Sequence, residues 1–361
     1  MPKAIINLKN MKHNIEYLKK VANTSQLFPV IKANGYGHGA VEIAKLLSNE
    51  DVFGFCVATE SEVLELIDNN ITKPILHLGR INPNNCKFLK FDNARCTIND
   101  LSDLDVLQKY SSEISKKIKC HIKIDTGMHR MGMKFTDFKE KIDMLMSSDY
   151  LDVEAIYSHL ACSNDINANQ NIEQIEKFKL CVDIISKYKQ VKYHLLSTSG
   201  IFNYNDNIYD FARIGLSIYG ASSLGKIDKN LKPVMELKAT VKLIKNIKEG
   251  ESIGYGATYT AEKDMKVAII QCGYADGLPL SFSNNGYVEF ESKIFSILGR
   301  ISMDLICIEV DEKVKLFDEV TLWGSDNDKM RLEVISEKHN SMPYVFLTNL
   351  SRRVKRVYIN E

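Results

Sequence analysis

The chain has 361 residues, more than one compact hydrophobic core usually organises, so we expect a large domain and a smaller one. Its 47 basic and 46 acidic side chains nearly cancel, which argues against nucleic acid or an anionic membrane surface as a partner. No stretch approaches the roughly 20 apolar residues of a membrane span, and the first 20 residues carry no apolar signal segment. We therefore expect a cytoplasmic protein that does not bind a membrane.

The first part of the chain, from about Ile5 to Gly220, alternates short apolar runs with amphipathic segments. This alternation is typical of repeated β-α units around a parallel sheet. Helices are predicted at residues 39–49, 59–70, 101–110 and 171–189, the second of which begins with the capping box Thr59-x-x-Glu62. The eight strand candidates are residues 28–32, 54–58, 75–79, 94–98, 121–125, 154–160, 192–197 and 209–215.

Eight such units predict an α/β fold, a closed (β/α)8 barrel of the TIM type over residues 1–228. A doubly wound open sheet is the alternative, because strand order does not follow from one sequence. After the polar stretch 222–233, the pattern changes to alternating β-type runs separated by turns, with one short helical segment near 332–337. Residues 229–361 are therefore predicted to form a smaller, mainly-β domain.

The eight cysteines lie singly along the chain, with no C-x-x-C pair. Several are embedded in apolar runs, where cysteine behaves as a small core side chain. We interpret them as reduced structural thiols and expect no metal site.

The first predicted strand runs directly into Lys32 and a glycine-rich turn that precedes a helix. In (β/α)8 enzymes the active site forms at the carboxyl ends of the strands, and glycines there let backbone N–H groups approach a bound anion. A lysine amine becomes nucleophilic when desolvation lowers its pKa, and it then condenses with an aldehyde cofactor. A single lysine is usually a solvated surface charge, so the position of Lys32 in the fold carries this hypothesis.

Other polar residues end later strands of the predicted barrel and should meet Lys32 at the same rim. Loops after strands seven and eight often build a phosphate site in this fold, which makes Thr198, Gly215 and Leu216 candidate phosphate contacts. Taken one at a time, each polar side chain is more often structural than catalytic. The further rim candidates are Arg130, His159 and Arg213.

The segment FPVIKANGYGHG (28–39) resembles the cofactor-binding signature of bacterial alanine racemases, in the lysine and in the Tyr-Gly-His-Gly that follows. Further segments resemble that family in the same order across both predicted domains, which one isolated motif would not do. They are HIKIDTGMHRMG, YSHLACSND, FARIGLSIYG, GYGATYTA, GYADG, GRISMD and MPYVFLTNLSRRVKR.

The resemblance implies a pyridoxal 5'-phosphate enzyme in which Lys32 binds the cofactor covalently and Tyr255 is the opposing base, with His159 behind it. It implies that Arg213 faces the pyridine nitrogen. Arg130 would contact the cofactor's phenolic oxygen and the substrate carboxylate, together with the backbone N–H of Met303. It further implies a homodimer with shared active sites. The implied phosphate contacts are Tyr36, Thr198, Gly215, Leu216 and Tyr344.

These roles agree with the chemistry of racemisation, which removes the α-proton from one face and returns it to the other, so two bases must flank the substrate. A phenol titrates near pH ~10, and a chain from Tyr255 through His159 to Arg213 would favour its ionised form. The implied function is interconversion of L-alanine and D-alanine, supplying D-alanine for peptidoglycan. The alternative is a broad-specificity or serine racemase of the same family, because pocket shape reads the substrate side chain.

Two non-racemase readings are less consistent with the residues. A fold-related decarboxylase would need an acidic partner at the pyridine nitrogen, where the chain offers Arg213. A cofactor carrier would resemble only the first domain.

Four positions depart from the family's usual residues: Thr198 follows Ser197 where Asn-Ser is common, and Ser302, Val345 and Lys355 replace Cys, Glu and Pro. Thr198 keeps the hydroxyl that a phosphate contact needs. In part of the family, the lysine matching Lys123 is carbamylated and bonds to the arginine matching Arg130.

Overall fold

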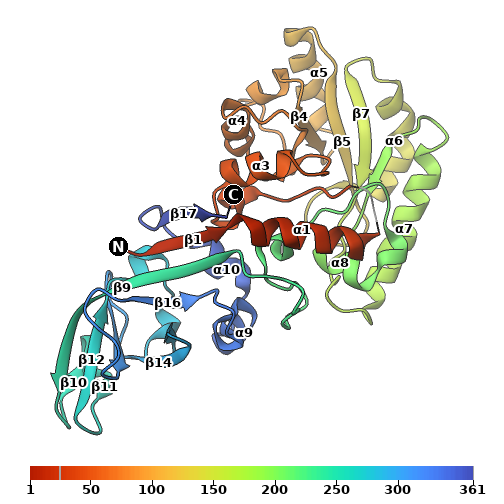
Figure 1. Cartoon of the computed structure of the whole chain (residues 1–361). Helices are drawn as coiled ribbons and strands as arrows, with labels where there is room; N and C mark the ends of the chain where they lie inside the picture. The colour runs from red at the N-terminus through yellow and green to blue at the C-terminus, as the bar shows by residue number, and fades with distance from the viewer. Residues whose placement is uncertain (24–25, 361) are drawn as a thin grey trace. The chain divides into compact units, whose positions relative to one another are not determined.

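The computed structural model describes residues 1–23 and 26–360. The chain forms two compact units, drawn together in Figure 1. The first, which we call the barrel unit, comprises residues 15–35 and 40–218. The second, the β unit, comprises residues 1–14, 36–39 and 219–361.

The barrel unit contains a parallel sheet in the order β2-β3-β4-β5-β7-β8, with the two-residue β6 (Met133–Lys134) paired to β5. The strands β2, β3 and β4 are mostly apolar and are buried along their whole length. Strands covered on both faces are expected to be continuously apolar. The strands are β2 (Phe55–Val57), β3 (Ile75–His77), β4 (Ala94–Ile98), β5 (Ile118–Asp125), β7 (Leu151–Tyr157) and β8 (Lys192–His194).

The first and eighth strand candidates, residues 28–32 and 209–215, are extended segments joined by isolated bridges and are not regular strands. Leu27 bridges Ala212 on one side and Val52 on the other, and Ser197 bridges Arg213. These bridges close the ring between β2 and β8, so the predicted TIM-type barrel is confirmed and the open sheet is excluded. The short bridges leave the backbone at residue 32 available for a turn that a regular strand would not allow.

The four predicted helices are present as α3 (Ala40–Ser48), α4 (Glu60–Asp68), α5 (Asp103–Ile114) and α7 (Asn169–Ile185). The capping box is confirmed, since the Thr59 side chain accepts from the Glu62 backbone and the Glu62 side chain accepts from the Thr59 backbone. Before residue 219, three further α-helices with regular geometry had not been predicted. They are α1 (Leu8–Ala22), α6 (Phe135–Ser147), which packs against β5 and β7, and the short α8 (Thr198–Asn203). In the β unit, α10 (Pro343–Thr348) had not been predicted either.

The β unit is built on a closed antiparallel barrel in the order β12-β15-β14-β13-β16-β9, closed by a second pairing of β9 with β12. The long β9 makes this closure possible, because its first half pairs with β16 and its second half with β12. The strands are β9 (Met235–Ile247), β12 (Met265–Ile270), β13 (Tyr287–Phe290), β14 (Lys293–Leu298), β15 (Ile306–Val310) and β16 (Glu319–Trp323).

Both ends of the described chain join this β unit, as the red and blue strands of Figure 1 show. The strand β1 (Lys3–Asn7) pairs antiparallel with β9 and parallel with β17 (Lys355–Ile359). A hairpin β10 (Ser252–Ile253) and β11 (Tyr259–Thr260) and the helices α9 (Leu332–Lys338) and α10 (Pro343–Thr348) complete the unit. Within the described residues, no helix is both long and apolar enough to span a bilayer.

Candidate active site

Lys32 opens a turn of left-handed backbone that follows the first extended segment of the barrel unit. The next residues have positive φ values, 52° at Ala33, 54° at Asn34, 60° at Gly35 and 50° at Tyr36. Non-glycine residues visit this region singly, so consecutive ones store strain of the kind found at functional sites. This turn forms the element α2 (Lys32–Tyr36).

Side chains of the barrel unit hold the turn in place. A carboxylate oxygen of Glu62 accepts from the Ala33 backbone N–H at 2.6 Å, and the other oxygen accepts from Ala58 at 2.7 Å. The Asn34 side chain accepts from the Ala40 N–H at 3.0 Å, where α3 begins. The same Glu62 that caps α4 therefore fixes the backbone beside Lys32.

Tyr36, one of the predicted phosphate contacts, belongs by its contacts to the β unit. Its ring stacks on Tyr219 with centroids 4.8 Å apart and lies 5.7 Å from the ring of Tyr344. Two residues predicted to hold the same phosphate are thus adjacent. The backbone after Tyr36 also packs closely against Leu347. This contact requires Gly37, because a Cβ at its φ of +80° would lie 2.1 Å from the carbonyl oxygen of Leu347.

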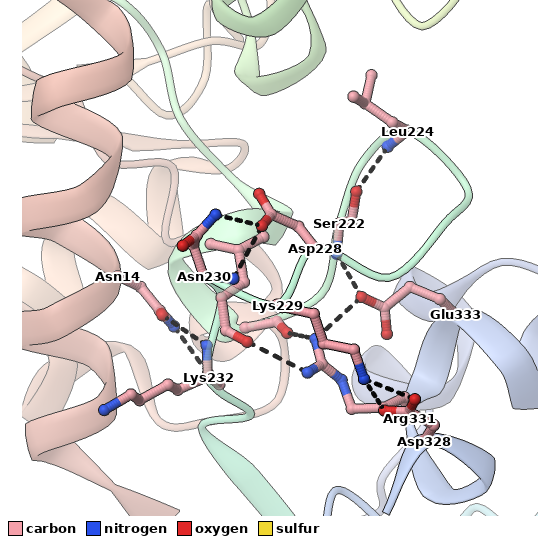
Figure 2. A network of polar contacts seen from close by, with 12 residues as sticks. Asn14, Ser222, Leu224, Asp228, Lys229, Asn230, Lys232, Asp328, Arg331 and Glu333 are labelled. Atoms are coloured by element: carbon pink, nitrogen blue, oxygen red, sulfur yellow. Dashed lines mark hydrogen bonds and ion pairs between the residues drawn. The ribbon is translucent and has the colours of Figure 1, made fainter. Parts of the chain in front are cut away.

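Buried polar contacts fix the segment that follows Tyr219, as Figure 2 shows. Arg331 donates to the carbonyl oxygens of Gly220 and Leu231 at 3.0 and 3.2 Å, and it pairs with Glu333. Glu333 also accepts from the Ser222 N–H at 2.8 Å. This charge-paired network holds the backbone next to the Tyr219 ring against α9.

In the barrel unit, Arg213 is 4% exposed and donates in several directions. Its Nη1 lies 2.7 Å from His194 Nδ1, and its Nη2 lies 3.1 Å from His159 Nδ1. Carbonyl oxygens of residues 158, 194 and 195 accept further bonds at 2.5, 2.9 and 3.0 Å. The Arg213–His159 contact predicted from the sequence is present, whereas the role of His194 had not been foreseen.

Positive charge gathers at this end of the barrel. Arg213 and Lys123 lie over the same Tyr157 ring, at 5.0 and 5.7 Å from its centroid. Burial, followed by the charges of Arg213 and Arg130, lowers the pKa of Lys123 to about 8. Burial and the same cations lower the pKa of His159 well below its usual value, so this ring is neutral. Such a site favours a ligand with several negative groups.

The predicted phosphate contacts of the barrel unit lie side by side. The Gly215 N–H donates to the Thr198 hydroxyl at 2.9 Å, and Thr198 begins the short helix α8. Leu216 is buried and follows at once. Thr198 stands where the family usually has serine, and its hydroxyl is oriented by the backbone N–H of Gly215.

Tyr255, the predicted second base, lies on a strained turn of the β unit and is 70% exposed. Positive φ values at Gly254, Gly256 and Ala257 surround it. Met303 is also exposed, and its carbonyl accepts from the Ala275 N–H at 3.0 Å, which joins the 273–277 and 299–304 segments.

The sequence profile of the alanine racemase N-terminal domain matches residues 6–223, and that of the C-terminal domain matches residues 234–358. The chain belongs to the alanine racemase family of enzymes. An alanine racemase of Carboxydothermus hydrogenoformans is 34% identical over 99% of both chains. One of Neisseria gonorrhoeae is 33% identical over 98% of both chains.

Solved structures of alanine racemases have the same fold. That of Clostridium difficile 630 is 31% identical, with a TM-score of 0.93 over 99% of this chain and 95% of its own. That of Bartonella henselae, solved with covalently bound pyridoxal phosphate, is 29% identical, with a TM-score of 0.89 over 99% of both chains. The Bartonella henselae enzyme therefore carries this cofactor on the fold described above.

The residues of the barrel unit fit pyridoxal phosphate. Its phosphate, its phenolic oxygen and an attached substrate carboxylate are anionic, and the end of the barrel offers Lys32, Lys123, Arg130 and Arg213. Arg213 has no acceptor atom, so its guanidinium matches an unprotonated ring nitrogen. Lys32, half-buried at the end of an apolar segment, supplies the amine that an aldehyde requires.

Proposed function

We propose that the protein racemises L-alanine and D-alanine with pyridoxal 5'-phosphate, using Lys32 and Tyr255 as its two bases. One observation carries the proposal. The barrel unit of a chain that belongs to the alanine racemase family contains both the strained turn of Lys32 and the neutral His159 paired with Arg213. When bound, pyridoxal phosphate withdraws electrons from the α-carbon of an attached amino acid. The chain must then remove the α-proton from one face and deliver a proton to the other.

Each proposed residue has one task in this reaction. Lys32 binds the cofactor and moves the proton on its own face, and Arg213 donates to the pyridine nitrogen and limits electron withdrawal. Arg130 and the backbone N–H of Met303 hold the substrate carboxylate. Tyr36, Thr198, Gly215, Leu216 and Tyr344 hold the phosphate, by donation from hydroxyl and backbone groups.

The tautomer of His159 supports a role behind Tyr255. Arginine only donates, so His159 Nδ1, 3.1 Å from Arg213, must accept. A neutral ring then carries its proton on Nε2, which is the atom left to donate to a second group. We propose that this group is the Tyr255 oxygen, whose ionised form such a donor stabilises.

We further propose that the active enzyme is a cytoplasmic homodimer in which Tyr255 of one chain serves Lys32 of the other. The 70% exposure of Tyr255 supports this, because a catalytic base needs a site from which bulk water is excluded, and a second chain would supply the missing cover. D-alanine for peptidoglycan is the proposed product. Residues 1–228 and 229–361 remain the proposed domains, although residues 1–14, 36–39 and 219–228 belong by their contacts to the β unit.

Incubation with L-alanine, L-serine and a panel of other L-amino acids in deuterated water tests the proposal. We expect D-alanine with deuterium at the α-carbon and little turnover of the others. Fast turnover of serine or of many substrates would establish the broad-specificity alternative, and release of CO2 without a D-isomer would overturn the racemase.

A further inference from the structure

A row of polar side chains leads away from Arg213 through the barrel unit and ends at Arg95. Arg213 Nη1 lies 2.7 Å from His194 Nδ1, and His194 Nε2 lies 3.0 Å from His121 Nδ1. His121 Nε2 lies 3.9 Å from a carboxylate oxygen of Glu154. Arg95 donates to both oxygens of Glu154, at 2.8 and 3.1 Å. The row crosses four strands, β8, β5, β7 and β4, and the proposed reaction uses only its first member.

The proton positions in this row follow from Arg213, which has no acceptor atom. His194 Nδ1 faces a guanidinium N–H, so it must accept, and the ring is neutral with its proton on Nε2. That proton points at His121 Nδ1, which must therefore accept as well. His121 then carries its own proton on Nε2, on the side of Glu154. Burial lowers the pKa of both histidines, in agreement with two neutral rings.

Glu154 reaches this position through an irregularity of the sheet. The register of β5 with β7 pairs Cys120 with Val153 and His121 with Ala155, so Glu154 is the extra residue of a β-bulge. Bulges turn a side chain out of the regular alternation and occur often beside active sites. Burial alone would raise the pKa of Glu154, but the contacts with His121 and Arg95 lower it to about 2, and the carboxylate is ionised.

We propose that Glu154 is a positioning residue for Arg213, acting through His121 and His194. Its negative charge favours the proton of His121 on Nε2, which leaves both Nδ1 atoms as acceptors and holds the guanidinium in one place. The catalytic consequence rests on the proposed function, in which Arg213 faces the pyridine nitrogen. Without the carboxylate, Arg213 alone opposes the form of His121 that carries its proton on Nδ1, toward His194, so a fraction of the molecules can adopt it. His194 must then present its own proton to Arg213, and the two donors repel each other.

Nitrogen-15 and proton NMR of the histidine rings in the full-length protein tests the row without any reaction. In the wild type we expect His121 and His194 to be neutral, with the proton on Nε2. A proton on Nδ1 of either ring, or a doubly protonated ring, would overturn the proposal without any variant having to fold. In Glu154→Gln we expect a measurable fraction of the Nδ1 form of His121.

Asp103→Asn is the control, since Asp103 is a still more deeply buried carboxylate of the same unit, and its partners are Arg80, at 2.9 Å, and the backbone of Asn99 and Asp100, none of which belongs to the row. It should leave both ring spectra unchanged. If Glu154→Gln also leaves them unchanged, Glu154 does not set the tautomers and the proposal is wrong.

Kinetics of the loaded enzyme tests the catalytic consequence. In Glu154→Gln we expect kcat to fall roughly tenfold, as for other orienting contacts, with KM little changed and a larger share of turnover lost to transamination. In a His121→Asn background, whose side-chain oxygen still accepts from His194, the same change should cost less than about twofold. An equal loss in both backgrounds would overturn transmission through His121. If the ring spectra behave as expected but the wild type does not racemise alanine, the proposed function fails while the positioning row stands.

Discussion

The two units of the chain hold their parts of the candidate site in different ways. In the barrel unit, Arg213 is 4% exposed and bonded to His159, His194 and three carbonyl groups. In the β unit, Tyr255 is 70% exposed on a turn whose neighbours have positive φ values. The barrel unit therefore holds its part of the candidate site through buried bonds, whereas the tyrosine of the β unit is exposed to solvent.

This contrast separates a preorganised part of the candidate site from a part that depends on what covers it. Groups held by several buried bonds keep their geometry without a ligand, and preorganised charge is the largest source of catalysis in many enzymes. An exposed base acts only after another surface excludes water from it. Variants in each unit separate the contribution of the barrel unit from that of the β unit.

Lys32→Ala has the largest expected effect. Racemisation should fall roughly a thousandfold or more, because removing a covalent-catalysis group costs orders of magnitude, and the visible absorbance of the bound cofactor should disappear. Borohydride reduction of the wild type followed by peptide mass mapping should place the cofactor on Lys32. Lys45→Ala, at an exposed lysine paired with Glu42, should behave as the wild type. A reduced adduct on another lysine would contradict the assignment.

Lys123→Met should change the pH dependence of stability. Between about pH 8 and pH 10.5 the folded protein leaves Lys123 largely uncharged, because its pKa is lowered to about 8, whereas the unfolded chain still protonates it. The unfolded state binds more protons in that window, so the wild-type free energy of unfolding rises with pH there by up to about 3 kcal/mol.

The variant lacks this term, so its advantage over the wild type should be greatest below pH 8 and shrink toward pH 10.5. Urea unfolding of the cofactor-free protein in CO2-free buffer measures the difference, with Lys45→Met as the control. A difference that stays constant with pH would mean that Lys123 is not desolvated.

Arg213→Glu should slow racemisation roughly tenfold and divert more turnover to transamination, because a carboxylate would favour a protonated, more strongly withdrawing pyridine ring. Arg213→Lys keeps the charge but loses the fork of donors, so its effect should be intermediate. Pyruvate formed per racemisation event is the quantity to measure. If Arg213→Glu leaves the ratio of pyruvate to racemisation events unchanged, Arg213 does not face the pyridine nitrogen.

The regular parts of the fold could be predicted because apolar period and helix caps are local signals. Thr59 and Glu62 marked a helix start that the structure confirms. The pairing of Lys3–Asn7 with Lys355–Ile359 was out of reach, since it joins the two ends of the chain. The left-handed turn after Lys32 was also missed, because Ala33 and Asn34 adopt it against their own preference.

Within the candidate site, the rim residues were predictable from the ends of strands, but the row behind Arg213 was not. His121 and Lys123 alternate along β5 and so point to the same face, which is the one signal that the sequence offered. Glu154 joins them only because a bulge shifts the register, and no local pattern marks that shift.

Complementation between two inactive variants bears most directly on the contrast between the units. Lys32→Ala removes the proposed base of the barrel unit and Tyr255→Ala the proposed base of the β unit, so neither variant should be active alone. After co-refolding, half of the dimers are mixed. If sites are shared between chains, each mixed dimer regains one site with both residues intact. Recovered activity should then approach roughly a quarter of the wild type.

Differently tagged chains must purify together, which shows that mixed dimers have formed. Mixed dimers without activity would show that Tyr255 does not act on the partner's Lys32, and the exposed tyrosine would then need a closure within its own chain.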